Sequence, residues 1–166
     1  MRKFISASLL AALVVAGVAS AGTATATFPV SATVTTNCLV STAGGGLAFG
    51  NYAPGGGALT GTTTITLKCT TGAVTVALNG GTTTGGTITQ RLMANGTNTL
   101  QYNLYQQAAD TTLWGNGTQG SSEATTGAGV TTPVNLTVYG LLPDNAINQV
   151  APTGSYSDLI TVTATF

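Results

Sequence analysis

The sequence predicts an all-β protein built as an antiparallel sandwich or barrel. This prediction rests on three observations. Apolar and polar residues alternate with a period of two in most of the chain, which is typical of strands with one buried face. Turn sequences such as Gly44-Gly45-Gly46 and Asn95-Gly96 separate the alternating segments. Beyond the N-terminal leader no segment has the period of a helix, and short strands between frequent turns are typical of sandwiches.

The chain begins with the features of a secretory signal. Two basic residues precede an apolar run from Ile5 to Val18, and the small residues Ala19-Ser20-Ala21 follow. A basic start, a short apolar run and an A-x-A cleavage site are the parts of a signal peptide. We therefore expect residues 1–21 to be removed on export, with Ala24-Thr25-Ala26 as a second candidate site. The remaining chain of about 145 residues fits one domain.

The next alternating segment, residues 24–34, lies before Cys38 and is about 36 Å long if fully extended. Its apolar face lies at the start of the processed chain, where chains usually fray. Such a strand can complete a neighbouring molecule by strand addition, or it can fold back into its own domain. Pro29 on its other face cannot donate a ladder hydrogen bond. The residues that would fill a partner's groove are Ala26, Phe28, Val30, Ala32 and Val34.

Five further segments alternate clearly between apolar and polar residues. Each is predicted to be a strand with Thr on its solvent-exposed face. They are residues 64–69, 74–78, 100–104, 134–139 and 160–166. Residues 106–110 are expected to make one helical turn at most, and residues 115–129 a long polar loop. The last strand ends the chain, so its outer edge is expected to be exposed. Its inward-facing residues are Ile160, Val162, Ala164 and Phe166.

Cys38 and Cys69 are expected to form a disulfide, because the chain is predicted to be exported and has two cysteines. Closing this loop would stabilise the fold by roughly 3–4 kcal/mol in the chain-entropy model. A metal pair is the weaker interpretation, since the chain has no histidine.

The composition argues against most enzymatic and nucleic-acid functions. Charged residues make up 5% of the chain and include no basic patch, so we expect no nucleic-acid partner. Without histidine there is no Ser-His-Asp triad and no usual zinc site. A carboxylate pair could in principle hydrolyse glycosides, but Asp110, Asp144 and Asp158 stand in turn-like contexts, and Asp158 is expected to cap a turn. We predict a non-enzymatic protein without cofactor or metal.

Short motifs recur along nearly the whole processed chain in a recognisable order. They are Thr36-Asn37-Cys38, Leu47-Ala48-Phe49-Gly50-Asn51-Tyr52, Tyr102-Asn103-Leu104-Tyr105, Leu113-Trp114-Gly115, Val138-Tyr139-Gly140 and the closing segment 154–163. In this order they resemble the spore coat protein U domain family, which includes subunits of archaic, Csu-type chaperone–usher pili.

The resemblance implies an incomplete immunoglobulin-like antiparallel β-sandwich, residues 37–166, that lacks its last strand. A periplasmic chaperone would fill the gap first, and an outer-membrane usher would then exchange it for residues 22–36 of another subunit. The donor residues would be those named above, beside the edge strand that ends at Phe166. The function implied is that of a shaft subunit of an extracellular surface fibre, a homopolymer or a polymer of related subunits, serving adhesion or biofilm formation.

Two alternatives stay open at this point. The first is a coat protein of a spore or cell surface that does not exchange strands. The second is a small outer-membrane barrel, because such barrels also end on an aromatic strand residue. The predicted disulfide and the aromatic fraction of 6% argue against the second alternative.

Overall fold

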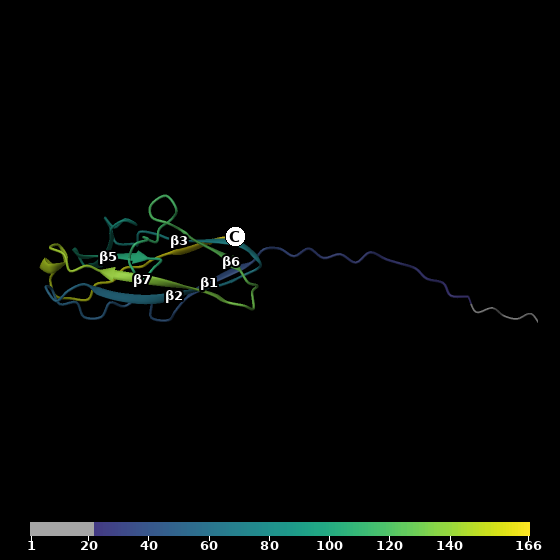
Figure 1. Ribbon diagram of the computed structural model, residues 1–166, viewed down its shortest axis with the longest axis horizontal. Helices are drawn as coiled ribbons and strands as arrows, with labels where there is room; N and C mark the ends of the chain where they lie inside the picture. Colours follow the sequence, from purple (N-terminus) through teal and green to yellow (C-terminus); the bar gives the residue numbers. More distant parts are fainter. Residues whose placement is uncertain (1–21) are drawn as a thin grey trace, which may run out of the picture. The chain divides into compact units, whose positions relative to one another are not determined.

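The computed structural model describes residues 22–166, and the predicted signal peptide lies outside the described residues. The chain divides into two compact units, Met1–Thr33 and Val34–Phe166. In the first unit, residues 22–33 carry no regular secondary structure (Figure 1), and each of these residues is exposed. No helix within residues 22–166 is long and apolar enough to cross a membrane.

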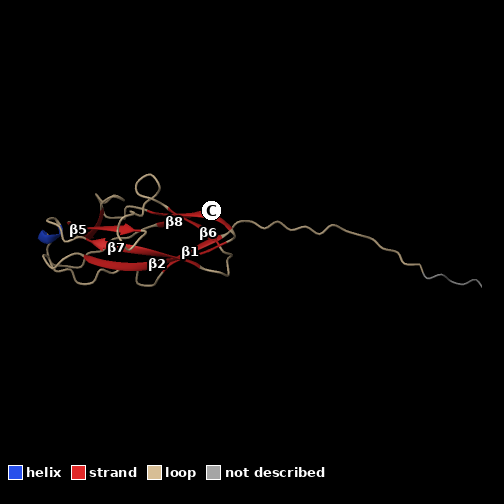
Figure 2. Ribbon diagram, viewed as in Figure 1, coloured by secondary structure: helices blue, strands red, loops and turns tan. Residues whose placement is uncertain are grey.

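The second unit is formed by two antiparallel sheets that face each other (Figure 2). The five-stranded sheet has the order β1-β2-β7-β5-β4, and the three-stranded sheet has the order β6-β3-β8. A short 3-10 turn, η1 (Asn148–Val150), follows β7. The strands are β1 (Cys38–Thr42), β2 (Leu59–Cys69), β3 (Gly72–Leu78), β4 (Arg91–Asn95), β5 (Asn98–Tyr105), β6 (Glu123–Gly127), β7 (Val134–Leu142) and β8 (Val162–Thr165).

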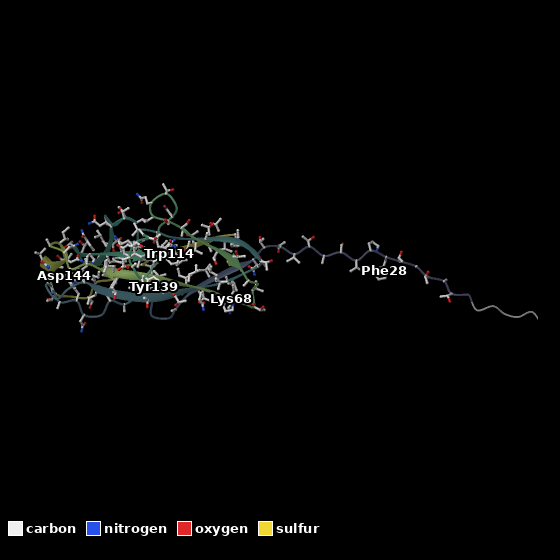
Figure 3. The ribbon with its side chains drawn as sticks, in the orientation of Figure 1. Phe28, Lys68, Trp114, Tyr139 and Asp144 are labelled. Atoms are coloured by element: carbon white, nitrogen blue, oxygen red, sulfur yellow. A yellow bond between two sulfur atoms is a disulfide. The ribbon has the colours of Figure 1, made fainter. Side chains whose placement is uncertain are left out.

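The core lies between the sheets and follows the alternation of the sequence. Ile65 and Leu67 of β2 face Val74 and Val76 of β3, and all four side chains are at most 2% exposed. Each such side chain contributes about 1.5–3 kcal/mol when it is buried. Trp114 is buried among them (Figure 3), and its indole N–H donates a hydrogen bond to the carbonyl of Val76 at 3.0 Å. The interior therefore holds one large aromatic anchor with a satisfied donor.

The five strands predicted from alternation are present as β2, β3, β5, β7 and β8, and the Asn95-Gly96 turn joins β4 to β5. The prediction of a loop over residues 115–129 was wrong, because β6 lies within it and pairs with β3. A Cβ atom on Gly127 would lie 2.1 Å from the carbonyl oxygen of Thr70. The close approach of β6 to the β2–β3 turn therefore requires glycine there.

The order of the strands is that of an immunoglobulin-like sandwich, as predicted. In that fold the strands A, B, E and D form one sheet, and C, F and G form the other. Here β1, β2, β7 and β5 correspond to the first sheet, and β3 and β8 correspond to C and F. The strands β4 and β6 extend the outer edges. No strand among residues 22–166 takes the position of G beside β8.

Candidate functional site

The site with the clearest functional character is the gap between the edge strands β1 and β8. Each of these strands has a neighbour on one side within the described residues, β2 for β1 and β3 for β8. β1 is antiparallel to β2, β8 is antiparallel to β3, and a tight turn reverses the chain between β2 and β3. It follows that β1 and β8 run in opposite directions along the gap.

An apolar cavity of about 320 Å³ opens in this gap. Thr42 of β1 lies on one side, and Ile160 and Val162 lie on the other. Its floor is made by core side chains from both sheets, namely Ile65, Leu78, Tyr102, Leu104 and Val138. The cavity thus reaches directly into the hydrophobic core.

A second cavity of about 650 Å³ continues the first toward the end of the sandwich. The two cavities share four lining side chains, so they adjoin each other, and we call the gap together with the first cavity the groove. The shared residues are Leu47, Phe49, Met93 and Tyr156.

The backbone of β8 turns its free hydrogen-bonding groups toward the gap. Successive residues of a strand direct these groups to opposite sides. The N–H of Asn79 donates to the carbonyl of Thr161 at 3.2 Å, so Thr161 faces β3. By alternation, Ile160, Val162 and Ala164 direct their N–H and C=O groups away from β3.

The backbone of β1 has the same arrangement. The N–H of Ala43 donates to the carbonyl of Thr64 at 2.9 Å, so Ala43 faces β2. By alternation, Cys38, Val40 and Thr42 direct their backbone groups away from β2 and into the gap. Both sides of the groove therefore offer rows of donors and acceptors suited to one more strand.

Three of the four predicted edge residues lie against the first cavity or the core. Ile160 and Val162 line the first cavity, and Ala164 is half-buried against the core. Phe166 follows β8 and is 55% exposed. Pairing of these residues with a donor strand stays a prediction.

The disulfide between Cys38 and Cys69 is present, as predicted. These residues stand directly opposite each other in the β1–β2 ladder. The bond therefore fixes the first residue of β1, one side of the groove, to the last residue of β2.

The predicted donor residues are exposed side chains in the described chain. Phe28 is 82% exposed, Val30 is 84% exposed, and Val34 at the start of the second unit is 89% exposed (Figure 3). Ala26 and Ala32 are exposed as well, and none of the five lies in a strand. Their insertion into a groove stays a prediction.

Several groove residues were missed by the sequence analysis. Leu47 and Phe49 lie outside the strands, yet both line the cavities, and Cβ atoms on Gly61 and Gly140 would lie about 3 Å from their side chains. The alternation of Leu47 and Phe49 across Ala48 was a usable signal. Thr63 also lines the cavity, and its buried hydroxyl has no hydrogen-bond partner among the described residues.

The sequence analysis placed Asp158 in a turn, but its carboxylate ties together three parts of the fold. Oδ1 accepts hydrogen bonds from the backbone N–H groups of Thr82 (2.9 Å) and Thr83 (3.0 Å) and from the Thr83 hydroxyl (3.0 Å). Oδ2 accepts one from the hydroxyl of Tyr102 on β5 at 2.6 Å. We call Asp158, Tyr102, Gly81, Thr82 and Thr83 the Asp158 cluster.

Two opposing effects act on the pKa of Asp158. Burial alone would raise this pKa, but the hydrogen bonds from Tyr102, Thr82, Leu159 and Thr83 outweigh burial and lower it. The same burial and the bond to Asp158 raise the pKa of Tyr102. The carboxylate is therefore charged and the phenol neutral at physiological pH, which fixes the phenol as donor.

Arg91 lies beside this cluster and is fully buried. Its guanidinium donates to the carbonyl oxygens of Asn79 (2.9 Å), Ile88 (3.2 Å) and Trp114 (2.7 Å). Burial lowers the pKa of Arg91, and the negative charge of Asp158 acts in the opposite direction. A buried cation held by three carbonyls is a structural anchor.

Asp144 makes a second carboxylate-centred contact at the end of the sandwich. It accepts hydrogen bonds from the hydroxyl of Tyr52 at 2.5 Å, from the N–H of Gly55 at 3.1 Å and from the N–H of Gly57 at 2.9 Å. The Tyr52 bond, followed by the two glycine bonds, lowers the pKa of Asp144 to about 2. Asp144 thus holds the loop between β1 and β2.

These side chains arrange the backbone, and their contacts do not resemble a reaction centre. Both carboxylates use their oxygens to accept hydrogen bonds from loops. Within residues 22–166 no group of three or more His, Cys, Asp or Glu side chains could hold a metal ion. The arrangement is an apolar groove between two open strand edges, a geometry with room for hydrogen bonds to an extended peptide.

A family model and a relative both match this chain over most of its length. The model of the Spore Coat Protein U domain matches residues 24–163. Protein U of Myxococcus xanthus is 36% identical over an alignment of 171 positions, which covers 94% of this chain and 92% of that protein.

A solved structure shares the fold. It is the chaperone–tip adhesion subunit pre-assembly complex, CsuC–CsuE, from the archaic chaperone–usher Csu pili of Acinetobacter baumannii. One of its chains matches with a TM-score of 0.52 and 22% sequence identity over 81% of this chain. This chain spans 40% of that chain, so the likeness is one of fold over part of a longer protein.

Proposed function

The chain belongs to the Spore Coat Protein U domain family, and from this premise we propose that it is a structural subunit of a surface fibre. Residues 24–34 of one copy would complete the sandwich of the next by occupying the groove between β1 and β8. The single observation that carries this proposal is that both sides of an apolar groove present free strand edges.

The side chains of the two partners are complementary. The groove is apolar and open to the core, and the donor segment has an apolar face of matching period. Phe28, Val30 and Val34 are strongly exposed, and each would contribute about 1.5–3 kcal/mol on burial. Backbone hydrogen bonds to both edges would add to this contribution, so the joint would dissociate slowly.

The direction of the inserted strand favours exchange between molecules. A strand antiparallel to β8, as in a complete immunoglobulin-like sheet, must run parallel to β1. Only residues 35–37 separate the donor segment from β1 in its own chain. Parallel neighbours need a connection of about a dozen residues or more. A strand in this direction must therefore come from another copy, whereas a self-inserted strand would have to be parallel to β8.

A donor strand that runs antiparallel to β8 also tolerates the missing N–H of Pro29. In a strand antiparallel to β8, the inward-facing donor residues bond to β8 and the outward-facing residues bond to β1. Pro29 is outward-facing, so its missing N–H falls on the side of β1. Because β1 has five residues and the donor segment is longer, this position costs at most one hydrogen bond.

The open groove also bears on how subunits would be exported and assembled. An open groove is an aggregation hazard until it is filled, and the structural neighbour is a complex of a chaperone with a pilus subunit. We propose that a periplasmic chaperone covers the groove, that an outer-membrane usher exchanges it for the next donor, and that the product is an extracellular homopolymer or a polymer with related subunits. Head-to-tail contacts of this kind propagate into fibres. The role is structural and non-enzymatic, in adhesion or biofilm formation.

The test measures which dimeric and higher species of the processed chain survive in mild detergent, where they form a ladder of bands. Phe28→Asp and Val30→Asp would place a charge in the apolar groove and should abolish dimeric and higher species. Ser31→Asp, on the outward face of the same segment, is the matched control and should keep the ladder. Unchanged ladders in the Phe28→Asp variant would refute strand exchange.

A coat protein without strand exchange is the second candidate. It is favoured by the similarity to Protein U over nearly the full length of both chains. A surface protein that assembles without ladders, and whose assembly tolerates Phe28→Asp, would establish this alternative.

A further inference from the structure

We propose that Asp158 is a positioning residue for strand exchange: it holds the start of the β8 edge in a receptive conformation before any donor arrives. This inference rests on the proposed function, since it concerns the groove that the donor would fill.

Backbone hydrogen bonds hold Ser157, which pairs with Ala94, and Thr161, whose carbonyl accepts from Asn79, but none joins residues 158–160 to a neighbouring strand. The pairing of β8 with β3 begins at Val162, opposite Leu78. Yet Ile160 lies before that point and lines the cavity that a donor would occupy. Something other than the regular ladder must fix this part of the edge.

Side chains hold both ends of residues 158–161. At one end, five hydrogen bonds to Asp158, including one from the Thr82 hydroxyl, attach it to the loop after β3 and to β5 of the other sheet. At the other end, the N–H of Thr161 donates to the Asn79 side-chain oxygen at 2.9 Å. Ile160 lies between these two attachments, and its backbone N–H and C=O groups are directed into the gap.

The fold makes room for the carboxylate at one specific glycine. Gly81 has a φ of +92°, and a Cβ atom there would lie 1.9 Å from Oδ2 of Asp158. Glycine therefore permits both the backbone conformation and the close approach of the carboxylate.

A carboxylate suits this position better than an amide does. Every partner of Asp158 in the cluster is a donor, so both of its oxygens must accept. Asp158→Asn keeps the size of the side chain but turns one acceptor into a donor and removes the charge. The loss of charge-assisted hydrogen bonds should release the edge and lower its capacity to receive a donor.

The experiment separates the receiving from the donating role in the full processed chain. A tagged acceptor chain carries Phe28→Asp, so it receives a donor but cannot supply one. It is mixed with an untagged chain that has the native donor segment, and the tagged fraction entering detergent-resistant bands is measured over time. Asp158→Asn is placed first in the acceptor and then in the donor.

We expect Asp158→Asn in the acceptor to slow capture by about tenfold or more, because each bond to a charged group contributes at least this factor. In the donor chain it should leave capture of the unmodified acceptor unchanged. Asp110→Asn in the acceptor is the matched control, since it makes the same substitution in the loop after β5, at a residue that lines neither cavity. It should capture donors at the normal rate.

Milder variants keep the test decisive if Asp158→Asn fails to fold. Tyr102→Phe removes only the bond to Oδ2 and should slow capture less. Gly81→Ala should slow capture, whereas Gly45→Ala, at a similar φ of +92° with open space around it, should not. Normal capture by folded Asp158→Asn or Tyr102→Phe acceptors would overturn the inference and leave strand exchange intact. No capture by the unmodified pair would overturn the proposed function and the inference with it.

Discussion

At the scale of single residues, this protein uses its few charges to fix loops. The chain has four acidic residues, and two of them, Asp144 and Asp158, each accept several hydrogen bonds from distant segments. Arg91 is buried in the same region and donates hydrogen bonds to three backbone carbonyls. Because the surface is otherwise rich in Thr, Ser and Asn, the loss of one such contact has few electrostatic compensations nearby.

The two carboxylates predict how stability depends on pH. Hydrogen bonds lower the folded-state pKa of both residues, to about 2 for Asp144. A lowered pKa means that their contribution is fully present above the unfolded value of about 3.9 and is lost as the pH falls through the folded value. We expect the free energy of unfolding of the Phe28→Asp monomer to fall with pH below about 4.

Denaturant unfolding at a series of pH values measures this slope. Asp158→Asn and Asp144→Asn should each flatten it in the acid range. A slope that neither substitution changes would show that these carboxylates do not control acid stability.

At the scale of elements, β1 is a short strand that is held on one side only, since it has five residues and pairs with β2 alone among the described residues. The disulfide from Cys38 fixes its first residue. The bond should therefore matter both for overall stability and for one side of the groove.

Removing the disulfide should lower the free energy of unfolding by roughly 3–4 kcal/mol, because the bond closes a loop of about thirty residues. The test compares Cys38→Ser/Cys69→Ser with the oxidised protein in denaturant unfolding, both carrying Phe28→Asp. The reduced protein with native cysteines is the control and should match the double variant. Equal stability of the oxidised and double-serine forms would contradict this account.

The sequence predicted the elements with strong alternation and missed those without it. Buried residues at every second position, such as Ile65, Leu67 and Cys69, made β2 readable from the sequence alone. β1, β4 and β6 were missed because each has only five residues and no clear alternation of apolar and polar residues. The pairing of β1 and β6 also depends on contacts far along the chain.

The residues of the groove were likewise predictable only where they belong to an alternating strand. Ile160 and Val162 were identified by their alternation in the last strand. Tyr102 and Asp158 could not be joined from the sequence, since 56 positions separate them and only the sandwich brings them together.

At the scale of the whole molecule, the described residues form a sandwich in which one strand position beside β8 is unfilled. Filling a groove that is open to the core should stabilise the body, because the donor binds the folded state and not the unfolded one. We expect ladder species to unfold at a higher temperature than the Phe28→Asp monomer. Scanning calorimetry measures the difference, and Ser31→Asp should behave as the unmodified polymer does. Coincident transitions for polymer and monomer would argue that the groove stays empty.

The most direct measurement places a photo-crosslinking amino acid at position 28 and assembles a mixture of isotopically heavy and light chains. Mass spectrometry then identifies the peptide joined to position 28 and the isotope content of both partners. We predict heavy–light pairs that join position 28 to the groove residues near Ile160, Val162 or Phe49. Crosslinks found only within chains of one isotope, or only outside the groove, would contradict strand exchange between subunits.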